Sequence, residues 1–466
     1  MVHDKGKRFM QSVDFPTKFP KEVYMQTIKN SGRALAIRVL GEILQDGAYG
    51  NIALRKALKG SPSAQENAFV TELVTVTLRN LTLIDYIIDG FVKAPADGMK
   101  PFIQNLLRVS VCQIRLLKRT PDHAAVNEAV ELAKGHGYRN LAGFVNGVLR
   151  NIARNPLKPT LPAESPDDPE SLALLYSFPV WLVKELQDWL GQDEAHEFIK
   201  LSHKPPVMTV YTNTTRTGSE SLTERLLSAG VVVTETVPAA KDSGDLPFLT
   251  LSRTGDIANL AAFKAGHFFV MDPGGAAAVK ALCPMPGQTV YDLAAAPGGK
   301  SFAIACLMEN RGVVKAFDIH PHRVELIRSS KRRLGLDIVE PMTNDLLSPN
   351  PALEETADAV LLDAPCSGLG TIRKHPETKY NRSTEDIENL SKQQKAMLAS
   401  AAKYVKPGGK LVYCTCTVAP MENDMVADEF AQSHPGFTLD SKRLIPPGEE
   451  NDGFFIATFS KKLQLH

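Results

Sequence analysis

The segment DLAAAPGGKS, residues 292–301, decides how the larger part of this 466-residue chain folds. It follows the β-rich run TVY and leads into FAIACLME, whose apolar character is typical of a buried helix. Small residues and two glycines at such a turn let a ligand approach the backbone, and the first turn of a helix offers unpaired N–H groups. The segment predicts a nucleotide-like ligand at a strand end, although a tight turn that needs glycine only for its geometry would have the same pattern.

Outward from this turn, from about residue 266 onward, short β-rich runs alternate with helical text. This alternation predicts a Rossmann-like α/β domain with a parallel sheet, in which ligands bind at the carboxyl ends of the strands. Asp318, Asp345 and Asp363 close three of the runs, in VVKAFD, EPMTND and AVLLD. An acid about 20 residues after a glycine turn usually binds ribose hydroxyls, so these carboxylates indicate an adenosine ligand.

The same segment leaves a second ligand open. AAAPGGKS at 294–301 nearly satisfies the phosphate loop of ATPases, and DAVLLD at 358–363 resembles their magnesium-holding strand. Ala294 stands where the first loop glycine is required, however, and Pro297 lacks an N–H group that would bind phosphate. S-adenosylmethionine, which has ribose and adenine but no phosphate, fits these residues better than ATP does.

Two of the six cysteines follow strand ends in this domain, Cys366 in DAPCSG and Cys416 in YCTCT. If their strands are neighbours, both thiols face one cavity beside the methyl-donor site. Carbon 5 of cytosine is a poor nucleophile, but addition of a thiolate to carbon 6 activates it. This chemistry would explain the presence of two cysteines beside a methyl-donor site. Asp363 would stabilise the adduct beside ring atom N3, and a second cysteine would assist its release.

The other four cysteines are interpreted differently. None of the six lies in a CxxC pair, and no metal site is predicted. Cys112, Cys283 and Cys306 lie in apolar helical text, which is typical of buried, unreactive thiols. Cys414 would share a strand face with Cys416 and is therefore a weaker rival for the nucleophile.

The motifs DLAAAPGGKS, LLDAPCSGLGTIRKHPE and LVYCTCTVAPMEND, with DGFF near the end, resemble those of the Sun-type RNA cytosine-C5 methyltransferases. The resemblance implies that Cys416 is the nucleophile and that Cys366 serves the release of product. It also implies that one loop and three acids bind S-adenosylmethionine, namely Ala294, Ala295, Ala296, Pro297, Gly298, Gly299, Lys300, Asp318, Asp345 and Asp363.

Several positions depart from the family pattern. Ala294 replaces a cysteine that is usual in the first motif, and Cys414 stands where serine is usual. Tyr211 replaces an arginine and Met271 replaces a glutamine that are common in the family. The RNA contacts of those two regions are therefore not carried over to this chain.

The first third of the chain predicts an all-helical domain, with apolar stripes at 126, 129, 130 and 133 and at 145, 148, 149 and 152. RALAIRVL and DHAAVNEAVELAKGHGYRNLAGFVNGVLRNI resemble the NusB-like RNA-binding domain, whose fusion to the catalytic domain is characteristic of the RsmB branch that modifies 16S ribosomal RNA. Residues 1–155 hold 22 Lys and Arg against 13 Asp and Glu, a net charge of +9, whereas the whole chain has +1. This basic charge agrees with RNA binding.

We therefore expect five parts: an extension at 1–30, a NusB-like domain at 31–155, a proline-rich linker at 156–170, a helix pair with a small α+β (RRM-like) unit at 171–260, and the methyltransferase domain at 261–466. The sequence has no apolar run of about 20 residues and no secretory signal, so we expect a cytoplasmic protein with no membrane partner. The predicted enzyme is a monomer with S-adenosylmethionine and 16S ribosomal RNA as partners. An RNA-associated P-loop-like ATPase and a non-enzymatic NusB-like RNA-binding protein are the alternatives, and the paired cysteines argue against both.

Overall fold

The computed structural model describes residues 31–60, 63–93, 96–117, 120–235, 246–348 and 350–463, so the predicted extension lies outside it. The chain divides into two compact units, with the boundary between Thr160 and Leu161. Two short segments, Tyr49–Asn51 and Leu78–Leu83, group with the second unit. None of the helices in these described ranges is long and apolar enough to cross a membrane.

The first unit is built from helices, and its core forms from the apolar stripes that the sequence predicts. Val126 and Ala129 on α7 and Val145 and Leu149 on α8 are all buried. The helices are α2 (Gly32–Leu44), α3 (Gly50–Leu58), α4 (Ala64–Arg79), α5 (Leu81–Asp89), α6 (Pro101–Val111), α7 (Asp122–Gly135) and α8 (Ala142–Arg154), with a π-helical turn at Cys112–Leu117. The predicted all-helical domain is confirmed.

The second unit contains a seven-stranded sheet in the order β10-β11-β9-β8-β5-β6-β7. Its strands are β5 (Thr289–Leu293), β6 (Val313–Asp318), β7 (Val339–Thr343), β8 (Ala357–Asp363), β9 (Val405–Thr415), β10 (Phe437–Ile445) and β11 (Phe454–Lys461). Five strands are parallel, but β11 runs antiparallel to β9, and β10 runs antiparallel to β11. The predicted parallel sheet is wrong at this edge, because the short connection between β10 and β11 permits only a hairpin.

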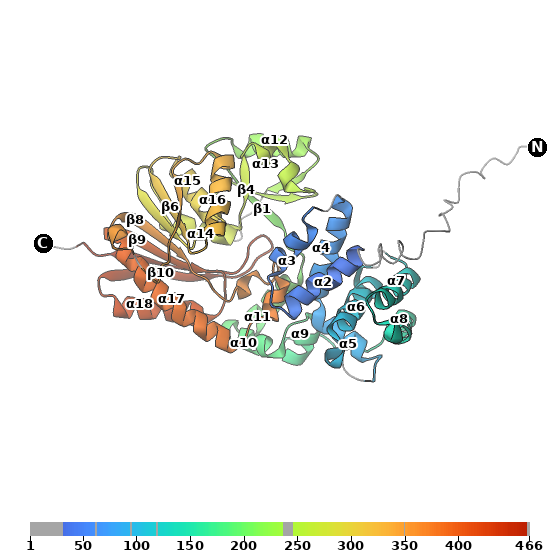
Figure 1. The fold of residues 1–466 in the computed structure, drawn as a ribbon. Coiled ribbons are helices and arrows are strands. Elements are labelled where there is room, and N and C mark those ends of the chain that lie inside the picture. Colours follow the sequence, from blue (N-terminus) through green and yellow to red (C-terminus); the bar gives the residue numbers. More distant parts are fainter. Residues whose placement is uncertain are drawn as a thin grey trace, which may run out of the picture. The chain divides into compact units, whose positions relative to one another are not determined.

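Helices cover both faces of this sheet (Figure 1). On one face lie α14 (Pro273–Leu282), α15 (Gly299–Leu307) and α16 (Pro321–Leu334), and on the other lie α17 (Thr384–Tyr404) and α18 (Asp424–Ser433). Successive strand residues alternate between the two cores, so Val412 packs into the first and Tyr413 into the second. Because both faces are buried at the centre of the sheet, β5, β8 and β11 are largely apolar, whereas the edge strands β7 and β10 carry exposed polar residues.

A smaller antiparallel sheet in the same unit has the order β2-β3-β1-β4. It comprises β1 (Met208–Thr212), β2 (Val232–Glu235), β3 (Phe248–Ser252) and β4 (Phe268–Val270), with α12 (Ser219–Ser228) and the short α13 (Ala261–Lys264). The small sheet therefore extends beyond the predicted boundary at 260, since β4 pairs with β1. Tyr211, at the position where arginine is common in the family, is buried against Phe248 and Phe269 and packs in the core.

Three helices precede this small sheet, where the sequence predicted a pair: α9 (Pro169–Leu175), α10 (Val180–Leu190) and α11 (Gln192–His203). The third helix was missed because its sequence, QDEAHEFIKLSH, is mostly polar. Its apolar residues Ala195, Phe198 and Ile199 nevertheless have helical spacing and are buried.

Asn213, directly after β1, connects the small sheet to helix α16, which covers the seven-stranded sheet. Its Nδ2 donates to the carbonyl oxygens of Gly266 and Leu334, at 2.9 Å each. The side chain is fully buried, so neither carbonyl could replace this bond with water.

We predict that Asn213→Ala lowers the free energy of unfolding by about 2–4 kcal/mol, because it leaves two buried carbonyls unpaired. Asn259→Ala is the matched control, since Asn259 is exposed and its side chain donates to Asp256 in its own turn. Urea denaturation measures both variants, and equal stabilities would contradict the connecting role.

Candidate active site

The parallel pairing of β8 with β9 sets the centre of the site, with Asp363 opposite Cys414 in the register. The loops that leave these two strands carry Cys366 and Cys416. Their Sγ atoms lie 3.3 Å apart, and both side chains are half-buried. The structure thus brings together two thiols that are 50 residues apart in the sequence.

The environment of Cys366 favours its protonated form. The hydrogen bond with Cys416, burial and the nearby carboxylates of Glu422 and Asp363 all raise the pKa of the Cys366 thiol. Cys366 therefore keeps its proton and can donate it across the 3.3 Å contact to Cys416.

One lysine neutralises the carboxylate at the end of β8. Lys300 Nζ lies 2.6 Å from Asp363 Oδ2, and Cys414 Sγ donates to Asp363 Oδ1 at 3.6 Å. Burial alone would lower the pKa of Lys300, but the charge of Asp363 and the hydrogen bond with it outweigh burial and raise that pKa. Lys300 is therefore an ammonium ion that orients Asp363, and it is not free to bind a phosphate.

A pocket of about 480 Å³ opens at the same edge of the sheet. Asp318, Asp345 and Asp363 line it with Cys366 and Cys416. Its apolar lining comes mainly from the ends of β5 and β6 and from the segments that follow β5, β6, β7 and β8: Leu293, Ala294, Ala296, Phe317, Ile319, Leu346, Leu347, Ala364 and Pro365. Carboxylates for ribose hydroxyls beside apolar walls for a purine ring are the chemistry that adenosine needs.

One unpaired group supports this fit to an adenosine ligand. Asn344 lines the pocket, and its Nδ2 atom is buried without a hydrogen-bond partner among the described residues. A buried donor without a partner is costly, and a ring nitrogen or ribose oxygen would supply the missing acceptor.

The predicted loop residues do not all face this pocket. Ala294 and Ala296 line it, and Ala294 has a positive φ of 68°. The rest of the predicted loop set does not belong to the pocket lining: Ala295, Pro297, Gly298, Gly299 and Lys300. Gly298 instead caps α15 with a φ of 110°, a value that favours glycine, and Lys300 is directed to Asp363.

Asp292, the first residue of the DLAAAPGGKS segment, is completely buried on β5. Its Oδ2 accepts a 2.5 Å bond from the Ser301 hydroxyl, and its Oδ1 has no partner among the described residues. Burial raises the pKa of Asp292 to about 7, although Ser301 and Lys300 oppose the shift. Asp292 therefore binds a proton in the folded chain at pH values where the unfolded chain has lost it.

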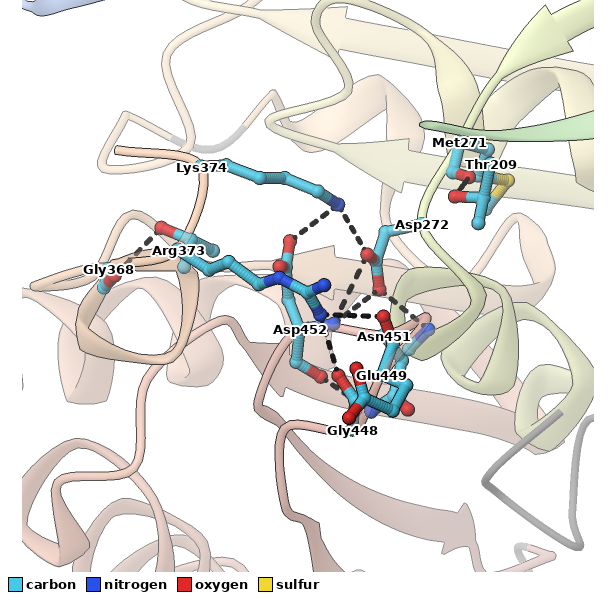
Figure 2. Close-up of polar contacts among 12 residues, drawn as sticks. Thr209, Met271, Asp272, Gly368, Arg373, Lys374, Gly448, Glu449, Asn451 and Asp452 are labelled. Carbon is cyan, nitrogen blue, oxygen red and sulfur yellow. Dashed lines mark hydrogen bonds and ion pairs between the residues drawn. The ribbon is translucent and has the colours of Figure 1, made fainter. Parts of the chain in front are cut away.

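A second charged cluster anchors the loop that follows Cys366 (Figure 2). Lys374 Nζ lies between two carboxylates, 2.5 Å from Asp272 and 2.9 Å from Asp452. Arg373 donates to the carbonyl oxygen of Glu449 at 2.6 Å. Sequence reasoning assigned no role to these residues, although IRKHPE and DGFF were among the motifs, because their pairing across distant segments has no local signal.

The remaining four cysteines do not line the pocket. Cys112 and Cys306 are buried, and burial raises the pKa of each to about 12, as expected of unreactive thiols. Cys414 is also buried, and burial followed by the charge of Asp363 raises its pKa. The expectation for Cys283 is wrong: it is exposed, because Pro284 ends α14 and Cys283 caps it in the left-handed region with a φ of 54°.

Three family models match successive parts of the chain. The NusB family matches residues 30–154, a ferredoxin-like domain of RsmF/B-like methyltransferases matches residues 178–243, and the 16S rRNA methyltransferase RsmB/F family matches residues 279–460.

Full-length relatives and a solved structure agree with these matches. The probable ribosomal RNA small subunit methyltransferase B of Bacillus subtilis is 37% identical, covering 93% of this chain and 99% of its own. The ribosomal RNA small subunit methyltransferase B of Shewanella oneidensis is 31% identical, covering 92% and 99%. The crystal structure of PH0851 is 28% identical with a TM-score of 0.76, and the match covers 94% of this chain and 99% of that one.

We predict that Asp292→Asn changes the pH dependence of stability. A carboxyl whose pKa is raised from 3.8 to about 7 by folding removes stability as pH rises between these values, because the unfolded chain releases its proton first. The variant should therefore gain stability relative to the original chain, by at least roughly 1 kcal/mol, between pH 4 and pH 7, and no further above pH 7.

Thermal and urea unfolding across this pH range measures the difference. Asp440→Asn is the matched control, because the exposed Asp440 also accepts a bond from a serine hydroxyl. A difference for Asp292→Asn that does not change with pH would contradict the buried, protonated carboxyl.

Proposed function

Because the chain belongs to the ribosomal RNA small subunit methyltransferase B family, we propose that it methylates carbon 5 of a cytosine in 16S ribosomal RNA through a covalent cysteine adduct. S-adenosylmethionine is the cofactor, as the sequence predicted, and it supplies the methyl group. The observation that carries the cytosine-C5 proposal is the 3.3 Å approach of Cys366 and Cys416 at the wall of the pocket. Methylation of an exocyclic nitrogen or of a ribose oxygen would need no pair of thiols.

Cys416 is the proposed nucleophile. Its Sγ adds to carbon 6 of the cytosine, and the electrons of the 5,6 double bond make carbon 5 nucleophilic enough to take the methyl group. Loss of the carbon-5 proton then returns the electrons to the ring and breaks the bond between sulfur and carbon 6. Because the thiol must approach from above the ring, the cytosine has to be unstacked from its neighbours.

Asp363 and Lys300 are proposed to stabilise the adduct. Protonation of ring atom N3 offsets the charge that thiolate addition develops on the ring, and the Asp363 carboxylate can accept hydrogen bonds from N3 and the exocyclic amine. The 2.6 Å ion pair with Lys300 and the bond from Cys414 limit the positions that Asp363 can adopt. Asp363 would thus be ordered before substrate arrives.

Cys366 is proposed to serve the release of product. It stays protonated beside Cys416, so it can supply a proton to the departing thiolate or orient a water that removes the carbon-5 proton.

Asp318 and Asp345 are proposed to hold the adenosine part of the cofactor, and Ala294 and Ala296 to lie against it. The other loop residues are proposed to shape the turn: Ala295, Pro297, Gly298 and Gly299.

The basic helical unit is proposed to bind ribosomal RNA, mainly through its phosphates. Exposed cations on this unit include Arg38, Arg139 and Arg150. Binding by a NusB-like domain fits a substrate made in the cytoplasm, where we expect the protein to act as a monomer. The ATPase alternative is disfavoured because Lys300 is paired with Asp363.

We predict that Cys416→Ala and Cys366→Ala block different steps of the reaction. Cys416→Ala should abolish methylation and leave no protein–RNA adduct. Cys366→Ala should still allow attack and methyl transfer but stall elimination, so that RNA remains covalently attached. Denaturing gel electrophoresis with labelled 16S RNA detects the adduct, and Cys283→Ser is the control because that thiol is exposed and outside the pocket.

Two other outcomes would contradict these assignments of the cysteines. Accumulation of adduct in Cys416→Ala, but not in Cys366→Ala, would reverse the two roles. Full activity in both variants would exclude covalent catalysis by these thiols.

We also predict that RNA affinity of the full chain falls steeply with salt, because phosphate contacts release bound counterions. Changing Arg139 and Arg150 together to Gln should reduce the slope of log affinity against log salt by about 1–2. Filter binding measures the slope, and calorimetric titration with adenosylmethionine is the control, which should not change. A slope equal to that of the unmodified chain would exclude these two residues from the RNA contact.

A further inference from the structure

Two adjacent residues, Glu422 and Asn423, bond to residues that flank the paired thiols and have no role in the chemistry proposed above. They occupy the turn between β9 and α18, within the sequence APMEND. Glu422 is 0% exposed and Asn423 is 2% exposed. Side chains as polar as these are rarely buried completely unless several hydrogen bonds satisfy them.

Glu422 holds the loop that carries Cys366. The Ser367 N–H donates to Glu422 Oε1 at 2.8 Å, and the Ser367 hydroxyl donates to Oε2 at 2.5 Å. Gln394 Nε2, from α17, donates both to Glu422 Oε1 and to the Pro365 carbonyl, each at 2.9 Å. The residues before and after Cys366 are therefore fixed to the same pair of side chains.

Asn423 holds the loop that carries Cys416 in the same manner. Its Oδ1 accepts a 2.6 Å bond from the Thr415 hydroxyl, and its Nδ2 donates to the Thr417 carbonyl at 3.0 Å. The residues before and after Cys416 are therefore fixed to one amide. The hydroxyls of Ser367 and Thr417 also lie 2.7 Å apart, which joins the two loops directly.

We propose that Glu422 and Asn423 form a clamp of positioning residues that holds Cys366 and Cys416 in register for catalysis. Because the two residues are consecutive, the loops they hold cannot separate without breaking buried hydrogen bonds. This inference rests on the proposed function, since it assigns the clamp to the two thiols of that mechanism. Burial raises the pKa of Glu422 despite the bonds from Ser367 and Gln394, which agrees with a carboxyl that is shielded from solvent.

The clamp can be tested without RNA by measuring the rate at which Cys366 and Cys416 form a disulfide. Diamide accepts two electrons and two protons from a pair of thiols, which become a disulfide, and the rate depends on how often the two sulfurs meet. In a Cys283→Ser background, Asn423→Ala and Glu422→Gln should slow formation of the 366–416 disulfide on the order of 10–100-fold. Mass spectrometry of the digested protein measures that disulfide.

Matched controls separate positioning from general loss of stability. Asn259→Ala and Glu429→Gln change an exposed amide and an exposed ion-paired carboxylate, and both should form the disulfide at the original rate. If Asn423→Ala does not fold, Thr415→Val removes one clamp bond while keeping the side-chain shape, and it should slow the disulfide to a smaller extent. Retained adenosylmethionine binding shows that a variant is folded.

Activity gives the second readout. The clamp variants should lose turnover on the order of 10–100-fold while the KM for adenosylmethionine stays within about twofold, because the thiols move and the cofactor residues do not. An unchanged disulfide rate in folded clamp variants would overturn the clamp, whatever their activity. Slowed disulfide formation combined with an active Cys416→Ala protein would support the clamp's hold on the thiols and reject the covalent mechanism instead.

Discussion

The parallel pairing of β8 with β9 is the constraint on which the rest of the site depends. With Asp363 opposite Cys414, both strands end at the same edge of the sheet, and the loops that leave them start side by side. Strands in a sheet lie about 4.8 Å apart, so loops from adjacent strands can bring two side chains into contact without any long excursion. The 3.3 Å separation of the thiols follows from this pairing together with the bonds that fix each loop.

Two lysines within the site are paired with carboxylates, which balances their charge. Lys300 pairs with Asp363 beside the thiols, and Lys374 lies between Asp272 and Asp452, where burial and the charge of Asp272 raise the pKa of Asp452 to about 7. Such buried pairs are costly to form but define one geometry, because removing either partner leaves an unpaired charge. Asp318, which pairs with Arg323 at 3.6 Å, and Asp345 line the pocket, and both are proposed to meet the cofactor.

The sequence predicted the local features of the site better than its long-range contacts. A glycine-rich turn, strand-end acids and two cysteines each have a signature within a few residues, so the fold class, family and cofactor were correctly predicted. The antiparallel β10 and β11 were not, because strand direction depends on connection length and pairing. The prediction that Cys283 is buried was wrong because the surrounding sequence, VKALCP, is apolar up to the proline that ends the helix. The bonds of Lys300 to Asp363 and of Glu422 to Ser367 join residues 63 and 55 positions apart, and no local pattern indicates them.

The most direct test of the central claim is to identify the cysteine that bonds to the base. A 16S RNA fragment containing 5-fluorocytidine traps the adduct after methyl transfer, because fluorine at carbon 5 cannot leave as a proton does. After incubation with adenosylmethionine and digestion, mass spectrometry locates the nucleotide on the protein. The account predicts a methylated fluorocytidine attached to Cys416. A nucleotide attached to Cys366 or Cys414, or methylation of the unmodified RNA with no trapped adduct from the fluorinated one, would contradict it.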